Sequence, residues 1–313
     1  MQFNKQPLTY SQQVDLWEQR GLTFPDKAKA EFYFQNISYY RLSAYALPFQ
    51  QEKDKFNAGT EFDNVLDLYK FDRELRLVVL DAIERIEVAL RTQFIYSLSH
   101  KYGSHWQNIK AIYKPAYKNH QGRIIDIFQE TQSIIRDHCL SKYPEVFIRH
   151  YLDTYTQPPT PPSWMAIELL TIGQLSRLFS GLANNDDKRA IASYFSLHHT
   201  PFESWLHALT YGRNLCAHHS RFWNRDFVIQ ADIPKKNLKL PWINYHITNN
   251  CRCFYFLSVV KYFLQTINPE GHFKQRILDV MNKYPVTPIR FMGIPTDAQG
   301  NLIKWQSESL WQQ

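Results

Sequence analysis

The sequence is poor in glycine and cysteine and has no long uninterrupted apolar run. Ten glycines among 313 residues lie well below the ~7% average, which disfavours α/β nucleotide-binding folds that need tight glycine turns. Four unevenly spaced cysteines do not form a disulfide framework in a chain this long, so we expect a reducing compartment. The apolar stretch at 254–264 is interrupted by Lys261 and is shorter than the ~20 residues of a membrane span. The first ten residues lack an apolar signal segment, so we expect a cytoplasmic protein with no membrane partner.

The composition and charge are those of a folded protein with a basic surplus. Hydrophobic residues make up 44% of the chain, aromatic residues 15% and charged residues 21%, which is typical of globular proteins rather than disordered ones. The 36 Lys and Arg exceed the 29 Asp and Glu and give a net charge of +7. A positive surplus favours polyanionic partners through counterion release, although net charge alone does not specify nucleic acid.

Helical periodicity dominates the first half of the chain. Thr60 and Asp63 resemble a capping signal, and apolar residues then recur mostly at three- and four-residue intervals from Val65 to Leu98. This pattern predicts one long amphipathic helix, or two joined end to end. Three acids each precede a base by four residues, the spacing typical of a solvated charged helix face. These pairs are Asp72 with Arg76, Asp81 with Arg85, and Glu87 with Arg91.

Other segments also have helical patterns and are separated by prolines. An aromatic-rich segment ending in Pro48 predicts a short helix, and the proline-rich stretch at 157–163 predicts a stiff connector whose last residue, Ser163, caps the next helix. That helix is predicted over 164–182, followed by a turn at 184–187, with another helix around 251–264. We therefore expect an all-α, mainly helical fold with three parts: an N-terminal helical segment (1–59), a helical core (60–232) that contains the connector, and a C-terminal helical extension (233–313).

The most informative helix carries the segment YGRNLCAHHSRFWNR, residues 211–225. Thr200, Pro201 and Glu203 fit a capping box with proline at the first helical position, which predicts a helix that begins at Pro201 and runs through this segment. At 100° per residue, four polar residues spaced by four, three and four share one face. They are Asn214, His218, Arg221 and Arg225.

Arg213 lies at the margin of this polar stripe, about 100° from Asn214, and its long side chain can swing over the turn. If the helix ends soon after His219, Arg221 and Arg225 leave the stripe and only Arg213, Asn214 and His218 remain.

These groups suit the cleavage of RNA by its own 2′-hydroxyl. An imidazole, with an ordinary pKa of ~6.5, can accept the hydroxyl proton or protonate the leaving oxygen, and a guanidinium can stabilise charge on the phosphate. Asn214 can orient the imidazole or a phosphate oxygen. The products would be a 2′,3′-cyclic phosphate and a 5′-hydroxyl, and the reaction requires no metal and no cofactor. A structural alternative stays open, with Arg213 paired to an acid and His218 half-buried.

Two other chemistries fit the spacing poorly. Cys216 and His218 point about 160° apart on a helix, which disfavours a thiol nucleophile activated by this histidine. A zinc site built from Cys251 and Cys253 with the histidine pairs at 198–199 and 218–219 is disfavoured, because C-x-C lacks the usual zinc-ligand spacing.

The segment RNLCAH, from Arg213 to His218, resembles the Arg, polar residue and His motif of the HEPN ribonuclease superfamily. The rest of the chain resembles the Abi-like branch (AbiD and AbiF) of that superfamily. The matching stretches are KQPLTYSQQVDLWEQRGL (5–22), ISYYRLSAY (37–45), YKFDRELRLVVLDAIERIEVALR (69–91), PPSWMAIELLTIGQLSRLF (161–179), the motif itself, MGIP (292–295) and Trp305.

The resemblance implies a HEPN-like helical bundle in which two motifs face each other across a dimer. It implies endoribonuclease activity in abortive infection, an antiviral toxin role, with Arg213, Asn214 and His218 as catalytic residues. A small structured noncoding RNA is an implied partner. Glu168 matches a position where the family usually has an acid, and it either orients the site or is simply an acid in the first turn of a helix, favoured by the helix dipole.

The chain has one copy of this motif, so a composite site requires a second chain, and we expect a homodimer. Two alternatives stay open: a catalytically silent RNA-binding or sensing module, and a helical scaffold that binds only protein. We expect RNA rather than DNA as the partner. The residues expected to bind RNA are basic and lie at or after the motif: Arg221, Arg225, Lys235, Lys236 and Lys239.

Overall fold

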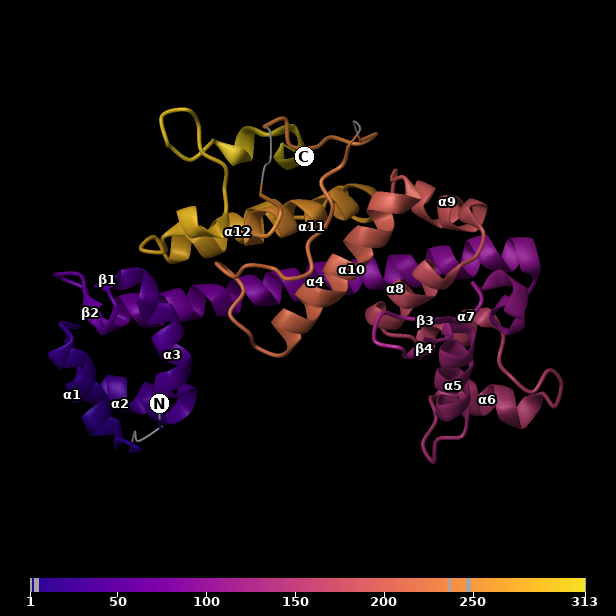
Figure 1. Cartoon of the computed structure of the whole chain (residues 1–313), viewed down its shortest axis with the longest axis horizontal. Coiled ribbons are helices and arrows are strands. Elements are labelled where there is room, and N and C mark those ends of the chain that lie inside the picture. The colour runs from indigo at the N-terminus through magenta and orange to yellow at the C-terminus, as the bar shows by residue number, and fades with distance from the viewer. Residues whose placement is uncertain (1, 3–5, 236–237, 246–248, 313) are drawn as a thin grey trace.

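The computed structural model describes residues 2, 6–235, 238–245 and 249–312. Its axis is α4 (Phe62–Tyr102), a helix of 41 residues that runs through the middle of the molecule (Figure 1). The predicted long helix is therefore confirmed as one continuous helix. The residue that caps its start is Glu61, whose N–H donates to the Asn64 side chain at 2.9 Å, and not the predicted Thr60 with Asp63. The apolar positions of the predicted stripe are buried along its whole length.

The N-terminal segment packs at one end of α4 (Figure 1). Its helices surround Trp17, which is buried and meets Phe34 edge-on with ring centroids 5.4 Å apart. The helix predicted before Pro48 is confirmed as α3. The elements are α1 (Tyr10–Gln19), α2 (Lys27–Ile37), α3 (Tyr39–Ala46), the 3₁₀ turn η1 (Leu47–Phe49), β1 (Gln50–Glu52) and β2 (Lys55–Phe56).

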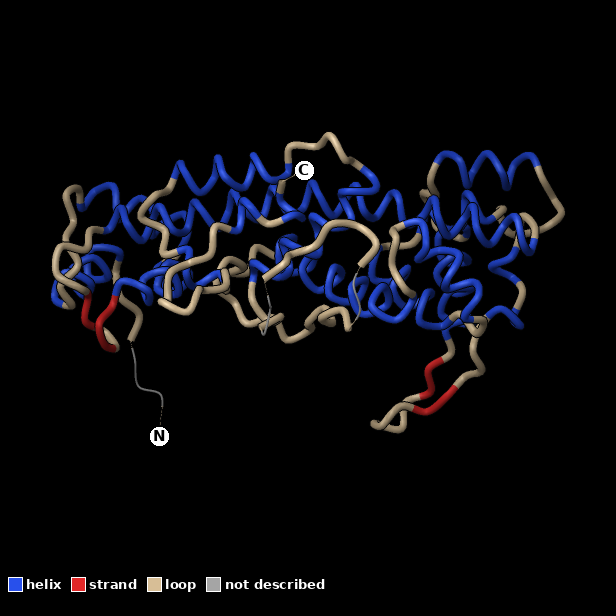
Figure 2. The backbone as a smooth tube through the Cα atoms, turned by 90° about the horizontal axis from the view of Figure 1, so that it is seen from above, coloured by secondary structure: helices blue, strands red, loops and turns tan. Residues whose placement is uncertain are grey.

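Short elements cluster at the other end of α4, and the hairpin of β3 and β4 projects from the body (Figure 2). In chain order these elements are η2 (Trp106–Asn108), η3 (Lys110–Ile112), β3 (Tyr117–Lys118), β4 (Ile124–Ile125), α5 (Ile127–Cys139), α6 (Val146–Thr154), α7 (Ser163–Ala166), η4 (Ile167–Leu169), α8 (Ile172–Gly181) and α9 (Asn185–Tyr194).

The single helix predicted over 164–182 is wrong. Leu170 adopts extended backbone angles, and Thr171 starts α8 with a capping box completed by Gln174. The predicted cap at Ser163 is also wrong, because Pro162 is the cap and the buried Ser163 hydroxyl hydrogen-bonds to Ser99 instead, at 2.7 Å. The predicted turn at 184–187 is the capped start of α9. Each error has the same origin, since capping residues fit both the ends and the interruptions of a helix.

The remaining helices cover the middle of α4. They are α10 (His199–Ala217), α11 (Cys253–Ile267), α12 (Phe273–Lys283) and the 3₁₀ turns η5 (Ile289–Met292), η6 (Trp305–Ser307) and η7 (Ser309–Trp311). The helix predicted around 251–264 is confirmed as α11, which is buried along most of its length. The fold is mainly α, as predicted: 60% of the chain is helical, and the described residues include two small hairpins. Within the described ranges, no helix is long and apolar enough to cross a membrane.

Candidate active site

α10 carries the Arg, Asn and His motif and is fixed by close packing. It begins at His199, because the His198 ring accepts a hydrogen bond from the Thr200 N–H at 3.3 Å. The predicted start at Pro201 is therefore two residues late. Pro201 instead lies in the first turn, where backbone N–H groups have no partner within the helix, so the N–H that proline lacks is not needed. Near the motif, Gly212 faces Phe256 of α11, and a Cβ at this position would overlap the ring.

The helix ends at the motif itself. His218 caps α10 with φ −90° and ψ 15°, and His219 has a φ of +57°, which turns the chain away from the helix axis. The Ser220 N–H then donates to the Leu215 carbonyl at 2.9 Å, as in a closed helix end. The prediction that the helix continues to residue 225 is wrong.

The polar stripe is correspondingly shorter. Arg221 and Arg225 lie in the loop that leaves the helix, so they are not on one face with Asn214. The motif that remains on or beside the helix is Arg213, Asn214 and His218, as the sequence predicts for a helix that ends early.

These residues lie together at the end of α10 and are open to solvent. Asn214 and His218 are exposed and Arg213 is half-buried. The Arg213 guanidinium donates to the Asn214 side-chain oxygen at 3.3 Å, and the His218 N–H donates to the Asn214 carbonyl at 3.0 Å. Across the described part of the chain, Arg213 makes no ion pair with an acid. The structural alternative of an acid-paired arginine and a half-buried histidine therefore does not describe this site.

The chain after the motif is tied to α3 by two arginines. Arg41 of α3 donates to the His219 carbonyl at 2.6 Å, and Arg221 donates back to the Ala44 carbonyl of α3 at 2.9 Å. Arg221, predicted to bind RNA, thus has a structural partner. Because His219 directly follows His218, this pair of contacts fixes the backbone that carries the imidazole.

A buried polar cluster on α4 holds the next part of the loop. The carboxylate of Asp72 is fully buried and accepts the N–H groups of Phe222 at 3.1 Å and Trp223 at 2.8 Å, the Tyr45 hydroxyl at 2.6 Å, and Arg76. Burial and the adjacent carboxylate raise the pKa of Tyr45, which keeps it a hydrogen-bond donor. The prediction of a solvated face is wrong for Asp72 and Arg76, because the loop's buried N–H groups require an acceptor.

The other two predicted ion pairs on α4 differ from this one. Asp81 and Arg85 are exposed, as predicted, whereas Glu87 and Arg91 are largely buried. Arg91 also donates to the Leu170 carbonyl at 2.9 Å and lies 4.0 Å from the carboxylate of Glu168. Glu168 is about half exposed, lies in the first turn of η4, and has Arg91 as a cationic partner. Its role in orienting the motif stays a prediction.

Two of the basic residues predicted to bind RNA, Lys235 and Lys239, lie at the far end of α10. Lys235 and Lys239 are exposed and line a hollow of about 690 Å³ beside His198 and Pro201. This end of α10 is roughly 25 Å along the helix axis from His218. Lys236 lies outside the described residues. Arg225 is half-buried in the loop after the motif.

The cysteines do not gather into a reactive site. Cys216 and Cys253 are buried, and burial raises the pKa of both thiols. Cys251 is half-buried and its Sγ lies 2.9 Å from the Asn249 side-chain oxygen. Among the residues the structure describes, no group of three or more His, Cys, Asp or Glu side chains is placed to hold a metal ion.

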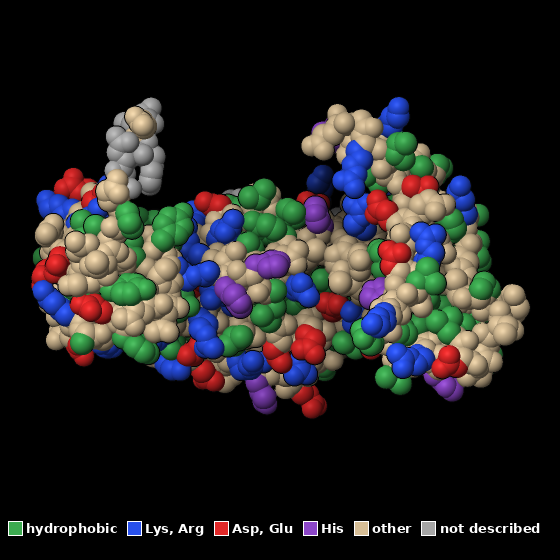
Figure 3. All heavy atoms as spheres, turned by 90° about the horizontal axis from the view of Figure 1, so that it is seen from below, with side chains coloured by type: hydrophobic (Ala, Val, Ile, Leu, Met, Phe, Trp, Pro, Cys, Tyr) green, Lys and Arg blue, Asp and Glu red, His purple; other side chains and the backbone are tan. Residues whose placement is uncertain are grey.

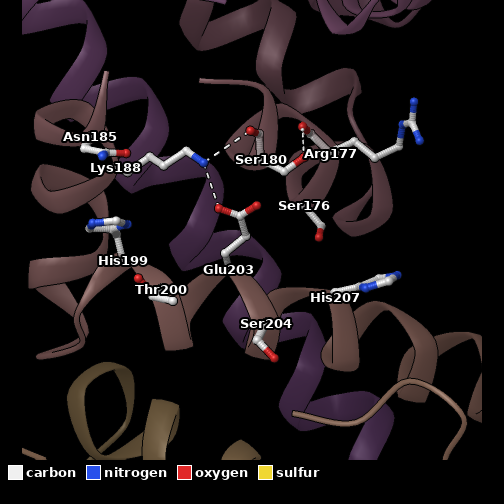
Figure 4. Close-up of a pocket in the computed structure, with 10 residues that line it drawn as sticks. All are labelled: Ser176, Arg177, Ser180, Asn185, Lys188, His199, Thr200, Glu203, Ser204 and His207. Atoms are coloured by element: carbon white, nitrogen blue, oxygen red, sulfur yellow. Dashed lines mark hydrogen bonds and ion pairs between the residues drawn. The ribbon is translucent and has the colours of Figure 1, made fainter. Parts of the chain in front are cut away.

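A polar groove that the sequence reasoning missed lies on the same helix. It runs between α8, α9 and α10 and includes Glu203 and His207 (Figure 4). Glu203, His207, Thr210 and Asn214 are spaced by four, three and four, so the polar stripe of α10 extends toward the N-terminus rather than beyond His218. Counting the same periodicity backwards from Asn214 would have found it.

Basic and histidine side chains also gather on the face toward which the C-terminal end of α10 points (Figures 1 and 3). The fold and the site together define a mainly helical protein with an exposed Arg, Asn and His cluster at a helix end. The chain belongs to the Abi-like protein family, whose model matches residues 32–224. This match covers more than half of the chain and includes the whole motif and Glu168. No curated protein and no solved structure matches the chain.

Proposed function

We propose that this protein is a metal-independent endoribonuclease of the HEPN type that acts in abortive-infection defence against phage. The observation that carries the proposal is the exposed cluster of Arg213, Asn214 and His218 at the end of α10, in a chain of the Abi-like family. Family membership alone does not specify a reaction, so the chemistry of the cluster supplies the substrate class.

The reaction begins with attack of a ribose 2′-oxygen on the adjacent phosphorus. One imidazole accepts the 2′-hydroxyl proton, the new O2′–P bond forms, and the P–O5′ bond breaks as the leaving oxygen gains a proton. Arg213 stabilises the negative charge on the phosphate through its N–H groups, and Asn214 holds the guanidinium in place through the 3.3 Å hydrogen bond. A 2′,3′-cyclic phosphate and a 5′-hydroxyl result.

Acid and base are both required, which supports a homodimer. One His218 would act as the base and His218 of a second copy as the acid, with the two motif ends facing each other. A two-fold interface is self-complementary and places the same surface of each copy in contact. The exposed position of the motif supports this arrangement, since a second chain can approach it directly.

RNA is the proposed partner, including a small structured noncoding RNA. The +7 net charge supports binding to phosphate. Arg225, Lys235 and Lys239 are available for such contacts, whereas Arg221 is already bonded to α3. Glu168 is proposed to act through Arg91 rather than on the RNA.

A second candidate function is an RNA-binding or sensing module that does not cut. The polar groove favours it, because it offers donors for RNA on α10 at some distance from the motif. In that case His218 would be dispensable.

The test is RNA cleavage in EDTA by the wild-type chain and by His218→Ala, with end-group analysis of the products. We expect cyclic phosphate ends, and a loss of at least ~100-fold in rate for the variant, as for removal of a general acid or base. RNA affinity should change little. His219→Asn is the matched control, because asparagine tolerates the positive φ of this exposed neighbour. The proposal would be refuted if His218→Ala cleaved RNA as fast as the wild-type chain, or if the wild-type chain lost its cleavage activity on addition of EDTA.

The homodimer is tested by sedimentation of the wild-type chain. A chain that stays monomeric at the concentrations where it cleaves RNA would exclude the composite site, whereas a dimer that loses activity on dilution in step with dissociation would support it.

A further inference from the structure

The groove between α8, α9 and α10 has the size of a ligand-binding site and is lined by polar residues. Its volume is about 660 Å³, within the ~300–1,000 Å³ typical of ligand pockets. The residues that line it come from three helices and all carry a polar group on the side chain: Ser176, Arg177, Ser180, Asn185, Lys188, His199, Thr200, Glu203, Ser204 and His207. Such a lining suits a ligand rich in hydrogen-bonding groups better than an apolar protein surface.

One ion pair organises the groove. The buried Lys188 ammonium donates to the Glu203 carboxylate at 2.7 Å and to the Ser180 carbonyl at 3.2 Å. Figure 4 shows the Glu203 carboxylate directed toward Lys188 in the middle of the groove, with His199 and His207 on opposite sides. Lys188 is thereby satisfied, and the side chain of Glu203, which lines the groove, is about one-third exposed.

The carboxylate decides how a nucleotide would lie. Because the Lys188 ammonium is already paired with Glu203, a phosphate gains little at the centre of the groove and lies toward the rim, where His207 is exposed and Arg177 is held by Glu130 at 2.9 Å. A base that bears an exocyclic amino group can instead donate to the carboxylate. Uracil carries a carbonyl at the position where cytosine carries this amino group, so at that position it offers the carboxylate an acceptor in place of a donor.

The position of the groove on α10 connects it to the motif. Glu203, His207, Thr210 and Asn214 share one face, and His207 precedes Asn214 by seven residues, about 10 Å along the helix axis. At the roughly 3.4 Å between stacked nucleotides, a strand at the motif reaches the groove within about three nucleotides.

We propose that this groove binds one nucleotide of the RNA strand, with an amino-bearing base facing Glu203 and its phosphate beside His207. The inference rests on the proposed function for the identity of the ligand, because RNA supplies the repeating ribose and phosphate units. It adds sequence preference to that function, a property that the motif residues alone do not provide.

The test measures binding without cleavage. The full chain carrying His218→Ala is titrated with fluorescein-labelled hexacytidylate and hexauridylate at one salt concentration, and fluorescence anisotropy gives the two affinities. We expect the cytidylate to bind about tenfold more tightly, as for one well-placed base contact. Adding Glu203→Gln should remove the preference, because an amide offers both a donor and an acceptor while still accepting from Lys188. Adding His207→Ala should weaken both oligomers by a similar factor.

Equal affinity of the two oligomers for the His218→Ala chain, or a preference that survives Glu203→Gln in a folded protein, would overturn the proposal. Free cytidine monophosphate distinguishes the source of the nucleotide. If it binds in a Glu203-dependent manner while the hexamers show no preference, the ligand is a free nucleotide and not RNA. Failure of the proposed nuclease would instead appear as absent cleavage by the wild-type chain, with the oligomer preference intact.

Discussion

Replacing Asp72 by alanine should destabilise the fold far more than the same change at Asp81, although both are aspartates on α4 with an arginine four residues later. Asp72 is fully buried and accepts hydrogen bonds from Tyr45, Arg76 and two backbone N–H groups. Without it, the guanidinium of Arg76, whose side chain is 4% exposed, is left buried without its carboxylate. Removing one partner of a buried ion pair costs about 3–5 kcal/mol.

Asp81 is the matched control. Its side chain is 38% exposed and pairs with Arg85 and Arg276, so solvent screens the loss and the expected cost is at most about 1 kcal/mol. Denaturant unfolding followed by circular dichroism measures the free energy of unfolding of each variant against the wild-type chain. A difference of less than about 1 kcal/mol between the two variants would refute the assignment of Asp72 as the anchor of the loop after the motif.

Three further outcomes are expected. Gly212→Ala should lower the free energy of unfolding by about 1–3 kcal/mol, measured by the same method, because the added Cβ overlaps a ring of α11; an unchanged stability would mean that the two helices are not in close contact. Acidification below about pH 4 should destabilise the fold by roughly 1 kcal/mol through Glu74 and Asp81. Partial burial raises the pKa of both carboxyl groups, but hydrogen bonds from α12 outweigh it and lower the pKa. The stability that these groups contribute is therefore present above their ordinary pKa and is lost as the pH falls through the lowered pKa. In an unfolding series from pH 6 to 3, charge-neutral Asp81→Asn should flatten the dependence of the free energy of unfolding on pH. Arg41→Met should lower kcat about tenfold or more with little change in KM, since it releases the carbonyl beside the motif histidine; restoration by Arg41→Lys would support positioning, and an equal rise in KM would argue for a direct RNA contact instead.

Some features of the fold are encoded locally and could be predicted from the sequence. The periodicity from Val65 to Leu98 identifies α4, and the low glycine content together with the helical patterns indicates the mainly helical class. The motif residues could be singled out because arginine, asparagine and histidine spaced within two turns suit one chemistry. Helix periodicity depends on neighbours three and four residues away, which any sequence displays directly.

The ends of the helices were harder to predict, because the same residues cap a helix and interrupt one. Thr171 lies inside the single helix predicted over 164–182 but caps the start of α8, and His219 stops α10 with a left-handed turn that its sequence does not specify. The polar groove was missed for a related reason. Its walls come from three helices, and only the α10 side of it is periodic in the sequence.

By itself, the sequence determined the long helix and the helical class, and it placed Arg213, Asn214 and His218 within two turns of one another, since each of these follows from spacing along the chain. Only the tertiary structure decided that Asp72 is buried while Asp81 is exposed, because the two backbone N–H groups that Asp72 binds come from a loop about 150 residues later. Tertiary structure also decided where α10 ends, through the contacts of α3 with the chain after His218. Local spacing sets which side chains share a face, and packing between distant segments sets which of those faces meets water.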